Sequence, residues 1–176
     1  LNSEYKFLKQ EMAYPNYDAK AESGSITAFS FGKDSLLSYA LLEEAGMEQE
    51  LVYVKDMFDC EANAKDMLKT RFEKEFKRQI NVVNDSSDKL FIEMHDKFNP
   101  LLTNAINSYS LIMLPFTYYH NYKYIVFGNE KNLSNCFINK DGYRVYASYD
   151  QTAEWVRQQT TFMSLLTSNK IKVFSP

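Results

Sequence analysis

The apolar residues of this chain gather in short unbroken runs that alternate with longer stretches of helical spacing. Five short runs, mostly apolar, predict strands at residues 26–29, 51–54, 80–83, 124–127 and 171–174. Unbroken apolar runs are typical of parallel strands that are buried on both faces. Because helical stretches separate these runs, the order predicts an α/β fold with a doubly wound parallel five-stranded sheet and helices on both faces.

Three stretches repeat apolar residues at helical spacing and predict helices at 36–45, 61–79 and 152–168. Gly46 follows the first stretch, and glycine is favoured just after a helix end. The side chains expected to face the core are Ala64, Met67, Leu68, Phe72 and Phe76 in the second stretch and Trp155, Phe162, Leu165 and Leu166 in the third.

The remaining chain adds weaker elements. From Ser87 onward, two helical pieces broken near residues 99–100 are expected, and Pro115 should kink the second piece. Residues 138–145, with Lys-Asp-Gly at their centre, predict a small hairpin.

Composition narrows the class of protein. The 176 residues suffice for one domain, and 45% apolar with 24% charged residues is typical of a globular protein. The net charge of −3 argues against a broad nucleic-acid surface. Two distant cysteines, Cys60 and Cys136, and two histidines, His95 and His120, show no zinc-ligand spacing, so we expect a reducing cytoplasm. No apolar run is long enough to predict a transmembrane helix.

Residues 30–35 (Ser-Phe-Gly-Lys-Asp-Ser) lie between the first predicted strand and the helix that follows it. The free amides of a first helical turn and the positive end of its dipole point at one spot, which favours an anion. Gly32 lets the backbone come close to a bound group, Lys33 adds a positive charge, and Ser35 adds a hydroxyl. The pattern predicts a phosphate or pyrophosphate site; the alternative is an ordinary strand-to-helix turn.

The same hexapeptide resembles the PP-loop of the ATP pyrophosphatases, Ser-Gly-Gly-x-Asp-Ser after a first strand. Ser30, Gly32, Asp34 and Ser35 match, and Phe31 replaces the first glycine. The resemblance implies a HUP (adenine nucleotide alpha hydrolase-like) fold that holds the pyrophosphate end of ATP while AMP passes to a substrate. The nucleotide contacts implied in this loop are Ser30, Phe31, Gly32, Lys33, Asp34 and Ser35.

A second polar group, Gly128, Asn129 and Glu130, follows the fourth predicted strand. Ligands of open parallel sheets bind at the carboxyl ends of the strands, where the strand order reverses. We expect the fourth strand to lie beside the first there, which would place this group next to residues 30–35. Carboxylates suit a hard cation, so Asp34 and Glu130 are the candidates for holding Mg²⁺. The alternative is a polar strand end without a ligand.

This group, the loop and Tyr149 together resemble the UDP-N-acetylmuramoyl-L-alanyl-L-glutamate epimerase branch of the PP-loop superfamily and its uncharacterised relatives. Thr152 stands where that branch has a serine. The matching positions are Phe29, Gly32, Lys33, Asp34, Ser35, Gly128, Asn129, Glu130 and Tyr149. The resemblance implies adenylation of a substrate carboxylate, or a similar group, with release of pyrophosphate.

Other candidate residues rest on position alone. Lys55 and Asp56 end the second strand, where similar proteins contact adenine or ribose; the alternative is surface charge. Arg144 and Arg157 are candidates for binding an anionic substrate, or else surface residues. Residues 85–87 (Asp-Ser-Ser) are read as a helix cap.

The leading hypothesis is therefore an ATP-binding, magnesium-dependent PP-loop enzyme with Lys33, Asp34 and Glu130 as catalytic residues, a small anionic substrate and possible self-association. The alternatives are a non-catalytic adenine-nucleotide-binding module and a nucleoside- or tRNA-modifying PP-loop enzyme. Residues 1–24 are read as a lead-in segment and residues 25–176 as the nucleotide-binding domain, possibly a piece of a longer protein.

Overall fold

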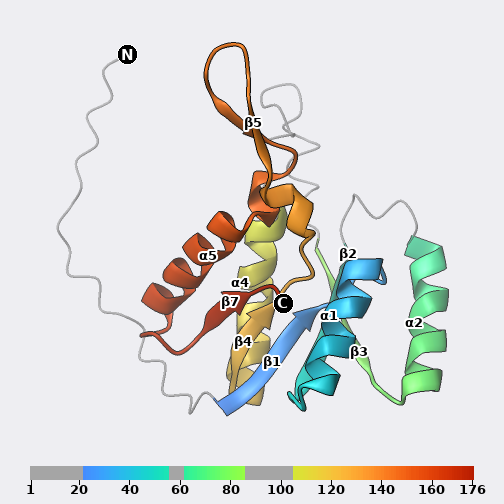
Figure 1. Ribbon diagram of the computed structural model, residues 1–176. Coiled ribbons are helices and arrows are strands. Elements are labelled where there is room, and N and C mark those ends of the chain that lie inside the picture. The colour runs from blue at the N-terminus through green and yellow to red at the C-terminus, as the bar shows by residue number, and fades with distance from the viewer. Residues whose placement is uncertain (1–21, 56–61, 86–104) are drawn as a thin grey trace.

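The computed structural model describes residues 22–55, 62–85 and 105–176 (Figure 1). In chain order they form β1 (Glu22–Ala28), α1 (Lys33–Glu44), β2 (Gln49–Lys55), α2 (Ala62–Phe76), β3 (Ile80–Asn84), α4 (Ala105–His120), β4 (Tyr122–Val126), the 3₁₀ turn η2 (Lys131–Ser134), β5 (Cys136–Ile138), β6 (Arg144–Tyr146), the 3₁₀ turn η3 (Tyr149–Gln151), α5 (Ala153–Leu166) and β7 (Lys172–Phe174).

Five of the strands form one parallel sheet in the order β3-β2-β1-β4-β7, which confirms the predicted doubly wound α/β architecture. The chain runs from β1 outward to β2 and β3, then crosses back to β4 and continues outward to β7. The strand order therefore reverses between β1 and β4, which pair in register with Ile26 opposite Ile125. The carboxyl ends of these two strands meet at the point where such sheets bind ligands.

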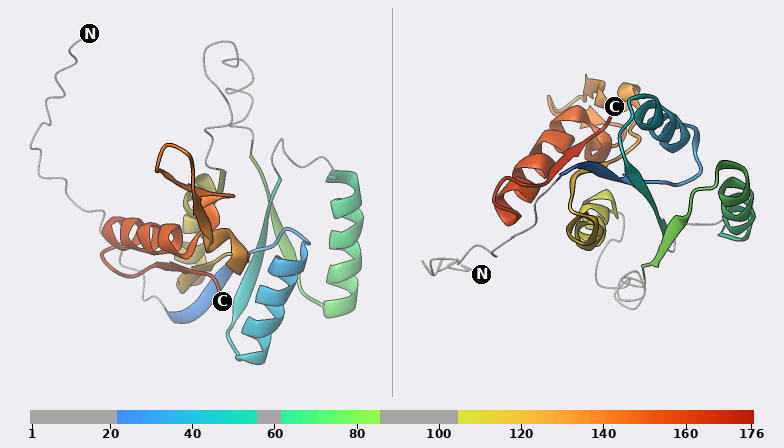
Figure 2. Two further views of the ribbon diagram at one scale, coloured as in Figure 1. Left: turned by 45° about the horizontal axis from the view of Figure 1, so that its top comes forward. Right: turned by 90° about the horizontal axis from the view of Figure 1, so that it is seen from below.

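Helices cover both faces of the sheet, as predicted, and each face has its own core (Figure 2). One core joins the sheet to α4 and α5 through Ile26, Val52, Met113, Tyr122, Ile125, Phe127, Met163, Ile171 and Val173. The other joins it to α1 and α2 through Phe29, Tyr39, Leu51, Tyr53, Phe72 and Ile80. Neighbouring residues of β2 enter opposite cores, because successive side chains of a strand point to opposite faces.

The face of β1 beneath α1 is polar rather than apolar. Ser25, Thr27 and Gln49 are all buried there. Thr27 Oγ1 donates to Gln49 Oε1 at 3.2 Å, and Gln49 Nε2 donates to the Tyr39 carbonyl at 3.0 Å and to Glu43 Oε1 at 3.1 Å. We call this set of hydrogen bonds the Gln49 bridge; it joins β1, β2 and α1.

The predicted inward faces of two helices need correction. In α2, Phe72 is buried, whereas the other apolar positions expected inside are exposed: Ala64, Met67, Leu68 and Phe76. In α5, the expected Phe162 and Leu165 are exposed, and the buried residues are Gln159 and Met163. Leu166 packs partly against the core as expected. Gln159 and Met163 are four residues apart and therefore lie on the same, buried face of α5. Phe162 and Leu165 project from the neighbouring face, which is exposed to solvent.

Several element boundaries also differ from expectation. β1 begins at Glu22, so three residues of the predicted lead-in belong to the sheet, and α1 begins at Lys33. α4 continues past Pro115 to His120. The hairpin is present as the antiparallel pair β5–β6. The first helical piece expected after Ser87 lies outside the described residues. No helix within the described residues is long and apolar enough to cross a membrane.

Candidate functional site

The turn between β1 and α1 places an uncapped helix N-terminus at the carboxyl edge of the sheet. Gly32 is the N-cap residue, with φ −77° and ψ 163°, and no side chain of the described residues caps the helix. The first backbone bond into the helix runs from the Leu36 amide to the Gly32 carbonyl at 3.0 Å. The earlier amides of the turn have no acceptor within a helix, and the helix dipole makes their end positive. The turn can therefore receive an anion.

Ser35 shapes this turn from inside. Its hydroxyl donates to the Gly32 carbonyl at 2.9 Å and accepts from the Ser30 amide and hydroxyl, each at 3.3 Å. Ser35 is buried, whereas Ser30 is exposed. The hydroxyl that the sequence suggested for phosphate binding is thus engaged in holding the loop.

Phe31 adopts a left-handed backbone conformation with φ +64°, where glycine is favoured. Its ring packs edge-to-face on Phe29, at 5.1 Å between centroids, and on Tyr53, at 5.3 Å. The position where the PP-loop motif has glycine therefore keeps the glycine-like backbone, and the ring extends the α1–α2 core.

This conformation gives a test. Phe31→Gly and Phe31→Ala both remove the ring, but only glycine removes the left-handed strain, so Phe31→Gly should be the more stable variant by about 1 kcal/mol. Urea unfolding of both variants measures the difference. Equal stabilities would contradict a left-handed Phe31.

Gly128, just beyond the end of β4, packs directly against the start of α1. A Cβ atom at Gly128 would lie 2.6 Å from the carbonyl carbon and oxygen of Asp34 and 2.8 Å from the Ser35 amide nitrogen. Because these neighbours are backbone atoms, no side chain could move aside to admit it. Glycine is thus required for β4 to approach the turn, and the structure brings the end of the fourth strand to the loop as expected.

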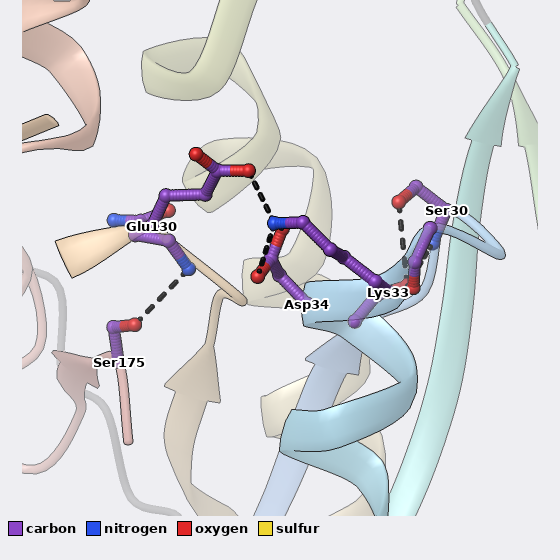
Figure 3. Close-up of polar contacts among 8 residues, drawn as sticks. Ser30, Lys33, Asp34, Glu130 and Ser175 are labelled. Carbon is purple, nitrogen blue, oxygen red and sulfur yellow. Dashed lines mark hydrogen bonds and ion pairs between the residues drawn. The ribbon is translucent and has the colours of Figure 1, made fainter. Parts of the chain in front are cut away.

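Lys33 connects the two sides of this edge (Figure 3). Its ammonium donates to Asp34 Oδ2 at 2.8 Å and Oδ1 at 3.0 Å, and forms an ion pair with Glu130 Oε1. The hydrogen bonds to Asp34 and then to Glu130 raise the pKa of Lys33. The Lys33 side chain is 73% exposed, so a ligand can reach this group, which we call the Lys33 triad.

The two carboxylates of the triad fit a hard divalent cation. Mg²⁺ is commonly held by one or two carboxylates together with substrate phosphates and water. Within residues 22–55, 62–85 and 105–176, no cluster of three or more His, Cys, Asp or Glu residues could hold a metal by itself. Asp34 and Glu130 would therefore hold Mg²⁺ only together with the phosphates of a ligand.

A groove of about 700 Å³ opens beside Glu130, at the carboxyl ends of β4 and β7. Its lining residues are Asn129, Glu130, Lys131, Ser134, Gln151, Ala153, Val156, Arg157, Thr160, Thr161, Val173, Phe174, Ser175 and Pro176. The backbone amide of Asn129 donates to Ser175 Oγ at 3.1 Å, and this bond joins the chain just after β4 to the chain just after β7 (Figure 3). Asn129 Nδ2 is buried and has no hydrogen-bond partner within residues 22–55, 62–85 and 105–176.

Other predicted site residues lie elsewhere. Lys55 forms an ion pair with Asp66 of α2 at 2.9 Å. The Tyr149 ring lies 5.2 Å from that of Tyr146 and 5.6 Å from that of Trp155, and Tyr149 does not line the groove. Arg144 is exposed on the hairpin.

Two further predictions involve residues outside the described part of the chain: Asp56, and the last two residues of the predicted cap at 85–87. The first residue of that cap, Asp85, is described, and its backbone amide donates to the Lys55 carbonyl at 2.9 Å.

Sequence reasoning missed Lys131 and Ser175 as groove residues. Ser175 follows β7, which lies beside β4. The rule that placed Gly128 beside the loop, that carboxyl ends of neighbouring parallel strands meet, would have found Ser175 too. Lys131 directly follows Glu130 and carried no motif of its own.

Comparisons with known proteins give little beyond this geometry. No known protein family matches the sequence, and no curated protein matches it. Among solved structures, the U34-tRNA thiolase NcsA from Methanococcus maripaludis, solved with its [4Fe-4S] cluster, is similar at 15% identity with a TM-score of 0.43. The match covers 90% of this chain and 52% of that chain, so the present chain spans about half of its length.

Proposed function

We propose that the chain is a PP-loop protein that binds the pyrophosphate end of ATP at residues 30–35. The observation that carries this proposal is the uncapped start of α1 at the reversal of strand order, with Lys33 above it and Gly128 packed against it. Amide donors, a helix dipole and a mobile cation at one point are the groups that bind a polyphosphate. The PP-loop motif at these residues supports the same ligand.

Each group has a role in this proposal. The amides of residues 31–35 would bind the terminal phosphates, and Lys33 would exchange one of its carboxylate partners for a phosphate oxygen. Asp34 and Glu130 would hold Mg²⁺, and this ion would neutralise part of the negative charge of the phosphates. Ser35 would act through the loop shape that its three hydrogen bonds fix.

We further propose that the chain transfers AMP to a carboxylate or a similar group. A carboxylate oxygen of the acceptor attacks the α-phosphorus and forms a new P–O bond. The bond from that phosphorus to the bridging oxygen breaks, and pyrophosphate leaves with the electron pair. The protein contributes mainly positioning and charge stabilisation to such a step. The matches of residues 128–130 and Tyr149 to the epimerase branch support a carboxylate acceptor.

Calorimetric titration with ATP, AMP and pyrophosphate in the presence of Mg²⁺ tests the nucleotide site. ATP should bind at least about tenfold more tightly than AMP, because AMP lacks the phosphates that the turn receives. Pyrophosphate should compete with ATP. Equal binding of ATP and AMP, or no competition by pyrophosphate, would contradict the proposal. Binding without pyrophosphate release in the presence of carboxylates would favour a non-catalytic module.

A further inference from the structure

The groove beside Glu130 shares a wall with the Lys33 triad, and its lining includes none of residues 30–35. Glu130 belongs to both, since it lines the groove and pairs with Lys33. The other walls come from the ends of β4 and β7 and from α5. A molecule in the groove would therefore lie next to a nucleotide bound at residues 30–35, without occupying the same space as its terminal phosphates.

Several polar groups of the groove are donors without a partner among the described residues. Asn129 Nδ2 is buried and has no hydrogen-bond partner there. Lys131 and Arg157 form no side-chain ion pair with any residue that the structure describes. Among the side chains of the lining, Glu130 carries the carboxylate, and it is already paired with Lys33. Buried and charged donors seek acceptors, so the groove is suited to an anionic group.

The wall along α5 and β7 offers apolar contact. Val156, Val173 and Phe174 line it. The two threonines beside them use their hydroxyl hydrogens within the protein: Thr160 donates to the Val173 carbonyl, and Thr161 donates to the Arg157 carbonyl at 3.0 Å. This wall therefore presents carbon surface to a ligand, next to the guanidinium of Arg157.

We propose that this groove binds the acceptor substrate, a small molecule with an anionic group that pairs with Arg157 and an apolar body that packs on Val156 and Phe174. The assignment of this ligand as the acceptor rests on the proposed function. The binding itself does not need ATP, because every group that makes it belongs to the groove.

The test compares two probes of the same size and apolar body, the anionic 3-phenylpropionate and its neutral amide, 3-phenylpropanamide. In NMR titrations without nucleotide, the propionate should shift the methyl signals of Val156 and the ring signals of Phe174 and bind more tightly than the amide. Arg157→Gln should weaken propionate binding about tenfold, as expected for the loss of a charge-assisted hydrogen bond, and leave amide binding unchanged.

Arg71→Gln is the matched control, since Arg71 is an exposed arginine of α2 outside the groove lining; it should leave both affinities unchanged. Equal binding of the acid and the amide to the unmodified protein would overturn the proposal, as would an unchanged propionate affinity in Arg157→Gln. Because ATP is absent, failure here with intact ATP binding removes only the groove assignment. Loss of ATP binding with intact propionate binding removes only the nucleotide site.

Discussion

Replacing Lys33 with alanine should lower the affinity for ATP by well over tenfold and abolish pyrophosphate release. The substitution removes a cation from the turn at residues 30–35, and it also leaves Asp34 and Glu130 without their shared partner. Two unopposed carboxylates would repel a triphosphate, so the loss should exceed that of one charged hydrogen bond. Calorimetric titration with ATP and Mg²⁺ measures the affinity, and a pyrophosphate assay measures turnover.

The fold should be unaffected by this change, because exposed ion pairs contribute little to stability. Lys140→Ala is the matched control, since Lys140 is an exposed lysine in the hairpin turn. It should bind ATP as the unmodified protein does. Unchanged ATP affinity in Lys33→Ala would rule out residues 30–35 as the site of the terminal phosphates.

Gly128→Ala should destabilise the protein by about 1–3 kcal/mol, the usual cost of overpacking a tight contact. It should also weaken ATP binding, because the new methyl group would push the end of β4 away from the first turn of α1. The contacts it would meet, 2.6 Å to Asp34 and 2.8 Å to Ser35, are with backbone atoms that cannot rotate away. Urea unfolding and ATP titration of the same variant measure the two effects.

Gly32→Ala provides the comparison within the same turn. Its φ of −77° suits any residue, and a Cβ atom there would meet only Ser30 Oγ at 3.4 Å. Its unfolding free energy should change by less than that of Gly128→Ala. If both variants were equally stable, the close approach of β4 to α1 could not be what requires glycine at position 128.

The sheet could be predicted from the sequence because its central strands are largely buried on both faces and so appear as unbroken apolar runs. The order of strands and helices then left few topologies, and the position of Gly128 beside the loop followed from the rule for carboxyl ends. The inward faces of α2 and α5 could not be predicted as well. Phe162 and Leu165 carry helical spacing in the sequence, but the packing of Met163 decides which face turns inward.

The candidate site was predictable only in part. The sequence motifs located residues 30–35 and 128–130. No sequence pattern predicted that the Ser35 hydroxyl would form hydrogen bonds within the loop, or that Lys33 would pair with both Asp34 and Glu130. These pairings depend on how two distant segments meet. The Phe31 ring is a similar case: the sequence marked a missing glycine, but only the surrounding core, with Phe29 and Tyr53, decides where the ring packs.

The Gln49 bridge has a consequence for the turn at residues 30–35. Apolar side chains can slide past one another at small cost, whereas a hydrogen bond weakens steeply once its atoms move out of line. With its amide bonded to the Tyr39 carbonyl and to Glu43, Gln49 fixes α1 lengthwise against β1 and β2. The amide donors at the start of α1 are therefore held in position by the fold itself, so an anion that bound there would cost little conformational entropy.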